Sequence, residues 1–393
     1  MKKVLIYFSC FGDSLGGSEY LPLLFISELQ RRCDVTLALN WQSDIAHIAR
    51  LAGLSIDTSN LKVEYVKPKG SLLRKLDAIV PFYRVRRLKE LSKDADICIS
   101  AANIIDFGKP AHHFVYLMRH FGDNAFYDYF MHVPPLRYVA HLRRKLRTWI
   151  ADHILRPVLG VRSTRQILAD PHERIYPNSR YVETTMQSFY GLFTSSVFYP
   201  PTTFDFHAET NPARHPLLVV CIGRIIPEKR VTEIIDIVAR ARRFANCDIR
   251  LRIAGQLTPQ TSYTKTIETI ASEREWIKLV GALYGEEKER FLLSGTYAIH
   301  TRRDEEFGIA VAEYIKAGLI PVVPDEGGTP EVVDSPALTY HTNEDAAQIL
   351  ANLIADADFR ERERVHCAER AKFFSREAYL ERQHELLNGI IDK

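Results

Sequence analysis

Short apolar runs rich in β-branched residues alternate with helical patterns along this chain, in two successive series. Such an alternation is typical of parallel sheets whose strands are covered by helices on both faces. The predicted fold class is therefore α/β, with two doubly wound, Rossmann-like domains. The expected strands are Val4–Ser9, Asp34–Leu39, Val63–Val66, Ile97–Ser100 and Phe114–Met118, then Leu217–Ile222, Ile249–Ala254, Ile277–Val280, Tyr297–His300 and Ile320–Val323.

The boundary between the two series is expected at Tyr199–Thr203, where two prolines precede a polar stretch. We therefore expect an N-terminal domain over residues 1–203 and a C-terminal domain over residues 204–375. Residues 376–393 are expected to form a helix with Ser375 as its N-cap, packing back on the N-terminal domain. Two such domains facing each other leave a cleft at the carboxyl ends of their strands, where ligands bind in these folds.

Composition excludes several classes of protein. An apolar fraction of 46% with 26% charged residues, over 393 residues, is ordinary for a globular chain, and a net charge of +3 does not argue for nucleic acid. The cysteines are scattered without a C-x-x-C pair, which favours reduced thiols in the cytoplasm. The amino terminus is interpreted as a buried strand, and no stretch reaches the ~18 apolar residues that span a bilayer.

The segment Arg303–Glu313 reads R-D-E-E-F-G-I-A-V-A-E, with Glu305 and Glu313 eight positions apart. A helix opening at Gly308 would point its unpaired amides and the positive end of its dipole at whatever lies above the preceding strand. One carboxylate just outside this helix and another on its second turn could hold a polyol beside an anion. The segment therefore indicates a sugar-nucleotide site. A solvated helix face is the alternative for the two glutamates alone.

Two further turns join a strand to a helix. After the first strand of the second series come Gly223, Arg224 and Lys229, where the two cations could neutralise a diphosphate and the glycine would let it approach. In the first series, Gly16 and Gly17 precede a helix and could hold a phosphate or close over a substrate. This second turn lacks the G-x-G-x-x-G pattern of nicotinamide-binding folds. The alternatives are a solvated basic turn and a plain tight turn.

In this order and spacing, the segments resemble the GT4 family of retaining glycosyltransferases, which have the GT-B fold. The resemblance runs from Val4 to the C-terminal helix and is most specific over Leu217–Val333. Its matching pieces are Gly16-Gly17-x-Glu19, Asn178-Ser179-Arg180 with Tyr199-Pro200-Pro201, Gly223-Arg224 with Pro227-Glu228-Lys229, Ile253-Ala254-Gly255, Val280-Gly281, Glu305-x-Phe307-Gly308 to Glu313, and Gly327-Gly328-x-Pro330-Glu331. Within the family, His300-Thr301 ahead of Glu305 and Phe307-Gly308-Ile309 is similar to the α-1,2-mannosyltransferases that extend lipid-linked oligosaccharides.

The resemblance implies transfer of a hexose-type sugar from GDP-mannose or a UDP-sugar to a hydroxyl of a glycan or lipid-linked acceptor, with retained configuration. Arg224 and Lys229 would hold the donor diphosphate and stabilise its growing charge, and Glu305 would contact the donor sugar. The other implied donor contacts are Gly223, Glu313 at the ribose, Gly255, Val280 and Gly281 at the nucleobase, and the amides around Phe307, Gly308 and Ile309. Gly16 and Gly17 would border the donor phosphate and the acceptor.

The family usually places a histidine at the end of a first-domain strand, near the transferred sugar. Two residues match this description in part. His120 follows the strand expected at Phe114–Met118, whereas His132 stands in M-H-V-P-P-L-R, closer to the H-x-P-x-R form of some relatives. Both stay candidates for a catalytic role, and a packed or surface role is the alternative for either.

No metal or other cofactor is expected, because lysine and arginine would do the work of a divalent cation. The D-x-D triplets at Asp94–Asp96 and Asp356–Asp358 lie away from the expected site. Two basic stretches with interleaved apolar residues, 67–89 and 137–150, suit the anionic inner leaflet and a lipid-borne acceptor. Solvated helix faces are the alternative, and nucleic acid is not expected because no aromatic platform accompanies the charge. The chain is expected in the cytoplasm, peripheral on the cytosolic face of a membrane.

Two other functions fit the same expected fold. A sugar-nucleotide 2-epimerase would convert its donor without any acceptor, and it needs first-domain carboxylates that the sequence does not identify. A non-catalytic module would bind a sugar nucleotide or a lipid without forming product.

Overall fold

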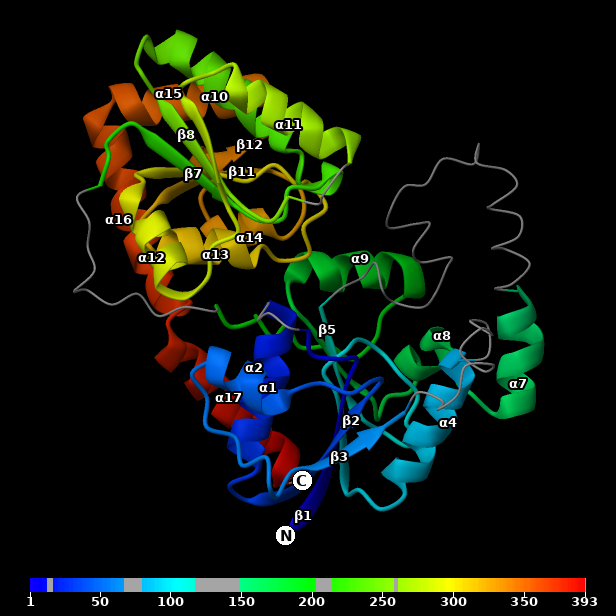
Figure 1. Cartoon of the computed structure of the whole chain (residues 1–393). Helices are drawn as coiled ribbons and strands as arrows, with labels where there is room; N and C mark the ends of the chain where they lie inside the picture. Colours follow the sequence, from blue (N-terminus) through cyan, green and yellow to red (C-terminus); the bar gives the residue numbers. More distant parts are fainter. Residues whose placement is uncertain (13–16, 67–79, 117–148, 203–213, 258–260, 393) are drawn as a thin grey trace. The chain divides into compact units, whose positions relative to one another are not determined.

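The computed structural model describes residues 1–12, 17–66, 80–116, 149–202, 214–257 and 261–392 (Figure 1). The chain forms two compact units, Met1–Pro200 with Arg382–Lys393, and Pro201–Glu381. The change from one unit to the other therefore falls within the proline-rich stretch Tyr199–Thr203. Each unit contains one six-stranded sheet in which every pair of strands is parallel. This confirms the α/β class, and all six cysteines are free thiols.

The sheet of the first unit has the strand order β3-β2-β1-β4-β5-β6. Its strands are β1 (Lys2–Phe8), β2 (Cys33–Leu39), β3 (Lys62–Tyr65), β4 (Ile97–Ser100), β5 (His112–Val115) and β6 (Arg174–Pro177). The chain begins with the central strand β1 and adds β2 and β3 on one side of it. It then crosses to β4, on the other side of β1, and adds β5 and β6 beyond it. The carboxyl ends of β1 and β4, where the direction of building reverses, form a crevice in folds of this order.

One strand of this sheet lies earlier than predicted, and another was not predicted. The strand expected at Phe114–Met118 is observed at His112–Val115, because the buried His113 pairs with Glu173 and so extends the strand in front of the apolar run. Beyond its end, the Tyr116 amide donates to the Asn103 side chain and not to a neighbouring strand. The unpredicted β6 has the sequence R-I-Y-P, which is short and ends on a proline.

Helices cover both faces of this first sheet. The helices α1 and α2 follow β1 and β2, whereas α4 precedes β4 and lies on the other face (Figure 1). The helical segments are α1 (Gly17–Leu29), α2 (Ile45–Leu51), α4 (Val80–Ser92), the π-helix η2 (Ala151–Leu155), α7 (Arg156–Leu159), α8 (Thr164–Leu168) and α9 (Arg180–Tyr190).

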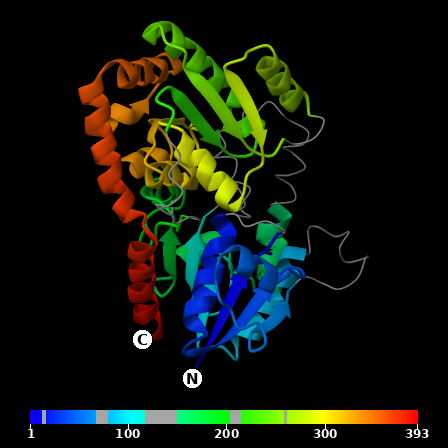
Figure 2. The same ribbon diagram turned by 60° about the vertical axis from the view of Figure 1, so that its left-hand side comes forward.

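The last helix, α17 (Arg376–Ile391), is capped as predicted by Ser375, whose Oγ accepts from the Ala378 amide at 3.1 Å. Its second half belongs to the first unit. There the buried Gln383 donates to the Leu24 carbonyl at 3.2 Å and His384 contacts Glu28 at 3.1 Å, so this half packs on α1 (Figure 2).

The second sheet has the order β12-β11-β10-β7-β8-β9, which repeats the topology of the first. Its helices α10, α11 and α15 lie on one face, and α12, α13 and α14 lie on the other (Figure 1). The strands are β7 (Leu218–Ile222), β8 (Arg250–Ala254), β9 (Ile277–Gly281), β10 (Tyr297–Ile299), β11 (Ile320–Pro324) and β12 (Thr339–Tyr340). The helical segments are η4 (Pro227–Lys229), α10 (Val231–Ala245), α11 (Ser262–Ser272), α12 (Gly285–Ser294), α13 (Ile309–Lys316), α14 (Thr329–Val333), η5 (Pro336–Leu338), α15 (Asn343–Ala355) and α16 (Ala357–Phe373).

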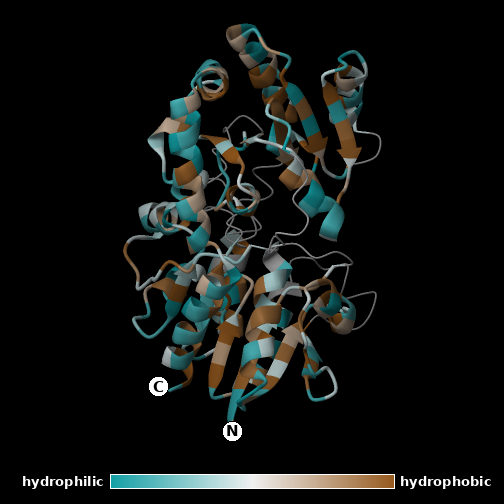
Figure 3. Cartoon of the chain, turned by 90° about the vertical axis from the view of Figure 1, so that its left-hand side faces the viewer, coloured by the Kyte–Doolittle hydropathy of each residue, from teal (hydrophilic) through white to brown (hydrophobic). Residues whose placement is uncertain are grey.

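Apolar side chains of the strands and the inward helix faces form the core of each unit. All residues of β11 are buried, and the apolar face of α10 is buried as well. Figure 3 shows the strands as mostly hydrophobic ribbons between helices of mixed character. Each buried Val, Leu or Ile side chain stabilises such a unit by about 1.5–3 kcal/mol before entropy is counted. Among the described residues, no helix combines the length and apolar character needed to cross a bilayer.

Candidate active site

Several of the predicted donor residues of the second unit gather where the order of its sheet reverses. The central strands β7 and β10 are neighbours, with Tyr297 opposite Val219. After β7 the chain continues to β8 on one side of the sheet, and after β10 it continues to β11 on the other side. This reversal opens the crevice where ligands bind in doubly wound folds. The turn Gly223–Arg230 follows β7, and the loop 300–308 follows β10. Residues from both line one pocket.

The turn after β7 fits closely against the end of β8. Gly223 has a φ of 151°, a conformation that side chains rarely adopt. A Cβ built on Gly255 would lie 1.8 Å from the Gly223 carbonyl oxygen, so only glycine fits there. The Gly255 amide donates to the Gly281 carbonyl at 2.7 Å, which brings the end of β9 to the same place. Gly223, Gly255 and Gly281, with Val280 beside the last, thus line the ends of three adjacent strands.

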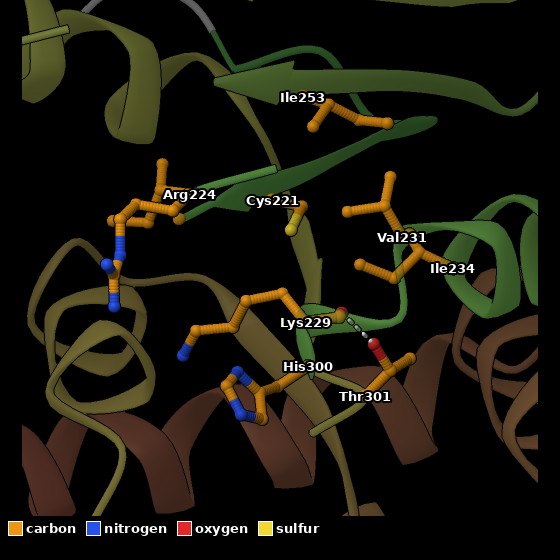
Figure 4. Close-up of a pocket in the computed structure, with 10 residues that line it drawn as sticks. Cys221, Arg224, Lys229, Val231, Ile234, Ile253, His300 and Thr301 are labelled. Atoms are coloured by element: carbon orange, nitrogen blue, oxygen red, sulfur yellow. Dashed lines mark hydrogen bonds between the residues drawn. The ribbon is translucent and has the colours of Figure 1, made fainter. Parts of the chain in front are cut away.

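Lys229 is fixed between this turn and the loop after β10. The Thr301 hydroxyl donates to the Lys229 carbonyl at 2.9 Å, as the dashed line in Figure 4 marks. The Lys229 ammonium in turn donates to Glu305 Oε2 at 2.5 Å. Their side chains are 23% and 14% exposed, so the ion pair borders solvent without being open to it. The neighbouring Arg224 is exposed.

Glu305 is surrounded by basic groups. His300 Nε2 lies 3.3 Å from Glu305 Oε2, and Arg302 Nη1 lies 3.3 Å from Oε1. Burial alone would raise the pKa of Glu305, but the Lys229 ammonium, His300 and Arg302 outweigh burial and hold that pKa well below its ordinary value. Glu305 is therefore ionised at neutral pH and can accept hydrogen bonds from hydroxyl groups.

Arg302 belongs to the site although the sequence reading did not select it. Its guanidinium is buried and also binds Glu306 at 2.9 Å and Asp304 at 3.1 Å. One arginine thus holds three consecutive acidic residues in a single loop conformation. The run R-R-D-E-E carried this signal, because consecutive acids beside arginines require pairing if the loop is buried.

The two glycines ahead of α14 fix the backbone of the same loop. Gly327 has a φ of 79°, and a Cβ there would lie 2.5 Å from the Arg303 carbonyl oxygen. A Cβ on Gly328 would lie 2.4 Å from the Glu306 carbonyl oxygen. The Gly328 amide donates to the Glu305 carbonyl at 2.8 Å. The Gly-Gly pair therefore sets where the carboxylate of Glu305 stands.

The helix α13 begins where the motif predicted a helix. Gly308 precedes Ile309 with a φ of 99°, which favours glycine, and Phe307 before it is buried. Glu313 is only 2% exposed, and its carboxylate binds the Lys288 ammonium of α12 at 2.9 Å. The structure thus places Glu313 on an ion pair within the unit, separate from the cluster around Glu305.

Several predicted residues fall in the first unit. Gly17 begins α1. Gly16, His120 and His132 lie outside the described residues, as do most of the basic stretches 67–89 and 137–150. In the described part of the first stretch, Arg87 pairs with Glu64 and Glu90.

The acidic triplets have structural roles where they are described. Asp96 accepts from the Lys3 amide at 2.7 Å, and Asp356 caps α16 by accepting from the Phe359 amide at 2.9 Å. A separate exposed group, Asp325, Glu326 and His341, brings its ligand atoms within 4.8 Å of one another. Arg303 contacts both of these carboxylates.

Comparison with known proteins identifies the segment that builds this site. Residues 203–373 match the family model described as glycosyl transferases group 1. The match covers less than half of the chain. The GPI3 subunit of phosphatidylinositol N-acetylglucosaminyltransferase from Saccharomyces cerevisiae is 26% identical over 131 residues. That match spans 33% of this chain and only 28% of the yeast protein.

Solved structures of the same fold match over nearly the whole chain. Sucrose-phosphate synthase from Thermosynechococcus elongatus has a TM-score of 0.69 at 14% identity, covering 100% of both chains. Anabaena HepE in complex with UDP has a TM-score of 0.66 at 14% identity, covering 99% of this chain and 100% of the other. The GT-B fold, and with it the resemblance to GT4-type glycosyltransferases, is confirmed.

Proposed function

We propose that this protein is a glycosyltransferase that moves a hexose-type sugar from a nucleotide sugar to an acceptor hydroxyl, with retention of anomeric configuration. The contact between Lys229 and Glu305 carries the proposal, because it joins the two segments that follow the central strands. The Lys229 ammonium, which would bind a phosphate, therefore lies beside the Glu305 carboxylate, which would bind a sugar hydroxyl. Exposed Arg224 lines the same pocket and adds a second cation.

The chemistry follows from where charge develops. Breaking the glycosidic bond leaves a growing negative charge on the diphosphate, and Lys229 with Arg224 would stabilise it without a metal ion. Ionised Glu305 would accept hydrogen bonds from the sugar, and the amides at the start of α13 would face phosphate or sugar. Glu313 would meet the ribose, which requires it to share its carboxylate with Lys288. Gly255 and Gly281 would border the base.

A UDP-sugar is the donor that we propose first, with GDP-mannose as the rival. The solved relatives include HepE in complex with UDP-glucose, and the yeast relative is named as an N-acetylglucosaminyltransferase. The phosphatidylinositol in that name supports a lipid-linked acceptor and a peripheral place on the cytosolic face of a membrane. His120 or His132 would be the catalytic histidine of the first unit. Of the variants His120→Ala and His132→Ala, the one that loses transfer should identify the catalytic histidine.

The test is transfer by the full chain. UDP-glucose, UDP-N-acetylglucosamine and GDP-mannose are each incubated with a panel of glycan and lipid-linked acceptors, and released nucleoside diphosphate and product anomer are measured. We expect one donor to give product of retained configuration. Lys229→Ala and Glu305→Gln should abolish transfer in a chain that still folds cooperatively, with a lower melting temperature because each breaks the partly buried ion pair. Lys372→Ala is the matched control, because Lys372 is exposed and pairs only with exposed Glu369 among the contacts described. Near-normal turnover in both site variants would refute the proposal.

A further inference from the structure

His300 holds a fixed position at the end of β10, beside the ammonium of Lys229 (Figure 4). Its backbone amide donates to the Val322 carbonyl at 3.0 Å, and its carbonyl accepts from the Tyr340 hydroxyl at 2.9 Å. The residue is only 5% exposed. Its imidazole therefore has little freedom to move away from the carboxylate next to it.

The imidazole nitrogen that faces Glu305 has an unused hydrogen-bonding capacity. Nε2 lies 3.3 Å from Glu305 Oε2 but makes no aligned hydrogen bond and is fully buried. The Lys229 ammonium donates to the same oxygen at 2.5 Å. A buried polar atom without a hydrogen-bond partner destabilises a fold, so the position of Nε2 beside Glu305 Oε2 requires an explanation.

Donor binding would change the partner of Glu305 Oε2. In the proposed function, the Lys229 ammonium turns towards the diphosphate and weakens its bond to Glu305. Arg302 cannot compensate, because its Nη1 reaches the other oxygen, Oε1, and its remaining nitrogens bind Asp304 and Glu306. When the bound nucleotide diphosphate carries no sugar, Oε2 would then be a buried anionic atom without a donor, unless a neighbour replaces Lys229.

We propose that His300 is a positioning residue that donates its Nε2 hydrogen to Glu305 Oε2 when Lys229 engages the donor diphosphate. The inference rests on the proposed function. No proton is transferred: His300 stays neutral with its hydrogen on Nε2, and one donor replaces another on the same oxygen. Glu305 thereby keeps its charge and orientation towards the donor sugar while Lys229 serves the phosphate.

The electrostatics suit a neutral donor at this place. Burial, with the nearby Lys229 and Arg302 cations, lowers the pKa of His300 despite the opposite effect of Glu305. A charged imidazole would repel Lys229, whereas a neutral one adds a hydrogen-bond donor without adding charge. Glutamine can reproduce this donor, because its side-chain amide extends about as far as Nε2, but asparagine is too short to reach.

The test is a double-mutant cycle on nucleotide binding by the full chain. Dissociation constants for UDP and GDP are measured calorimetrically for the wild type, Lys229→Met, His300→Leu and the double variant, and the nucleotide that wild type binds more tightly is used. We expect His300→Leu to weaken binding about tenfold when Lys229 is present, and less than about twofold in Lys229→Met. His300→Gln should bind within about threefold of wild type, and His300→Asn should resemble His300→Leu.

The outcomes separate this inference from the proposed function. A His300→Leu effect of equal size with and without Lys229 indicates a merely structural role and overturns the inference, as does equal binding by the Gln and Asn variants. If His300→Leu does not fold, the comparison of Gln with Asn decides. Wild type that binds neither UDP nor GDP overturns the proposed function itself.

Discussion

The Lys229 ammonium and the Glu305 carboxylate meet at 2.5 Å although 76 positions separate them in the chain. They meet because β7 and β10 are adjacent at the centre of the second sheet, so that the segments after both strands emerge side by side. The glycines at 255, 327 and 328 then permit backbone approaches that a Cβ would block. The geometry of the candidate site is thus a consequence of strand order and of glycine placement together.

Gly255→Ala should destabilise the protein strongly. The added methyl would overlap the Gly223 carbonyl oxygen, and relieving the overlap requires the two strand ends to separate. We expect the free energy of unfolding to fall by at least about 2 kcal/mol, measured by urea denaturation. Gly389→Ala is the control, since a Cβ there meets no atom within 4 Å and the glycine lies within α17. It should stabilise by about 0.5–1 kcal/mol. Equal stabilities of the two variants would contradict the described packing.

Arg162→Met should destabilise the first unit. Arg162 binds Asp106 at 2.9 Å and Glu173 at 2.7 Å, and both carboxylates are almost completely buried. Removing the guanidinium leaves buried anions short of a partner, which costs about 3–5 kcal/mol. Arg86→Met removes an exposed pair with Glu90 and should cost less than about 1 kcal/mol. Similar denaturation midpoints for the two variants would show that the buried network contributes little.

His300 should make the stability depend on pH. Because its pKa in the folded protein lies below the ordinary 6.5, the unfolded chain gains a proton there first as the pH falls. The free energy of unfolding should therefore decrease below pH 6.5, by at most about 1.4 kcal/mol per pH unit from this residue. His300→Gln should remove that part of the slope between pH 7 and 5. Below pH 4.5, carboxylates with lowered pKa values, among them Glu305 and Asp106, contribute stability that is lost as the pH falls further. Superimposable pH profiles of wild type and His300→Gln above pH 5 would disprove the assignment.

The basic stretch 137–150 should promote binding to anionic vesicles. Each cation near an anionic surface contributes about 1 kcal/mol. Replacing Arg143, Arg144 and Lys145 by glutamine should therefore weaken sedimentation with phosphatidylserine vesicles by about two orders of magnitude. Replacing the exposed Arg364 and Lys372 by glutamine is the control. If wild type sediments equally with neutral and anionic vesicles, the membrane proposal fails.

The sequence predicted the parts of the fold that depend on local pattern. Apolar runs located ten of the twelve strands found in the described residues, and the cap at Ser375 located the start of α17. It could not locate β6 or β12, because R-I-Y-P and T-Y are too short to show a period. It also placed β5 late, because the buried His113 looks polar in sequence and is made compatible with a core only by Glu173, 60 positions away.

In the candidate site, too, the sequence predicted what depends on residue type and local position, and missed what depends on tertiary contacts. Gly223, Arg224, Lys229 and Glu305 were selected by residue type and by their place after strands, and the structure gathers them. Arg302 and His300 were missed as site residues, because their importance comes from burial and from contacts with Glu305 that strand pairing creates. The sequence could not predict the pairing of Glu313 with Lys288 either, because this pairing depends on how α12 packs near α13.

The most direct measurement is a calorimetric titration of UDP and GDP into wild type, Lys229→Met and Arg224→Met, with Arg250→Met as the exposed control. If the turn after β7 clasps the donor diphosphate, wild type and Arg250→Met bind one nucleotide with equal affinity. Lys229→Met and Arg224→Met each bind it at least about tenfold more weakly, because a charge-assisted hydrogen bond is lost. Equal affinities in all four proteins, or no binding by wild type, would contradict the proposed site.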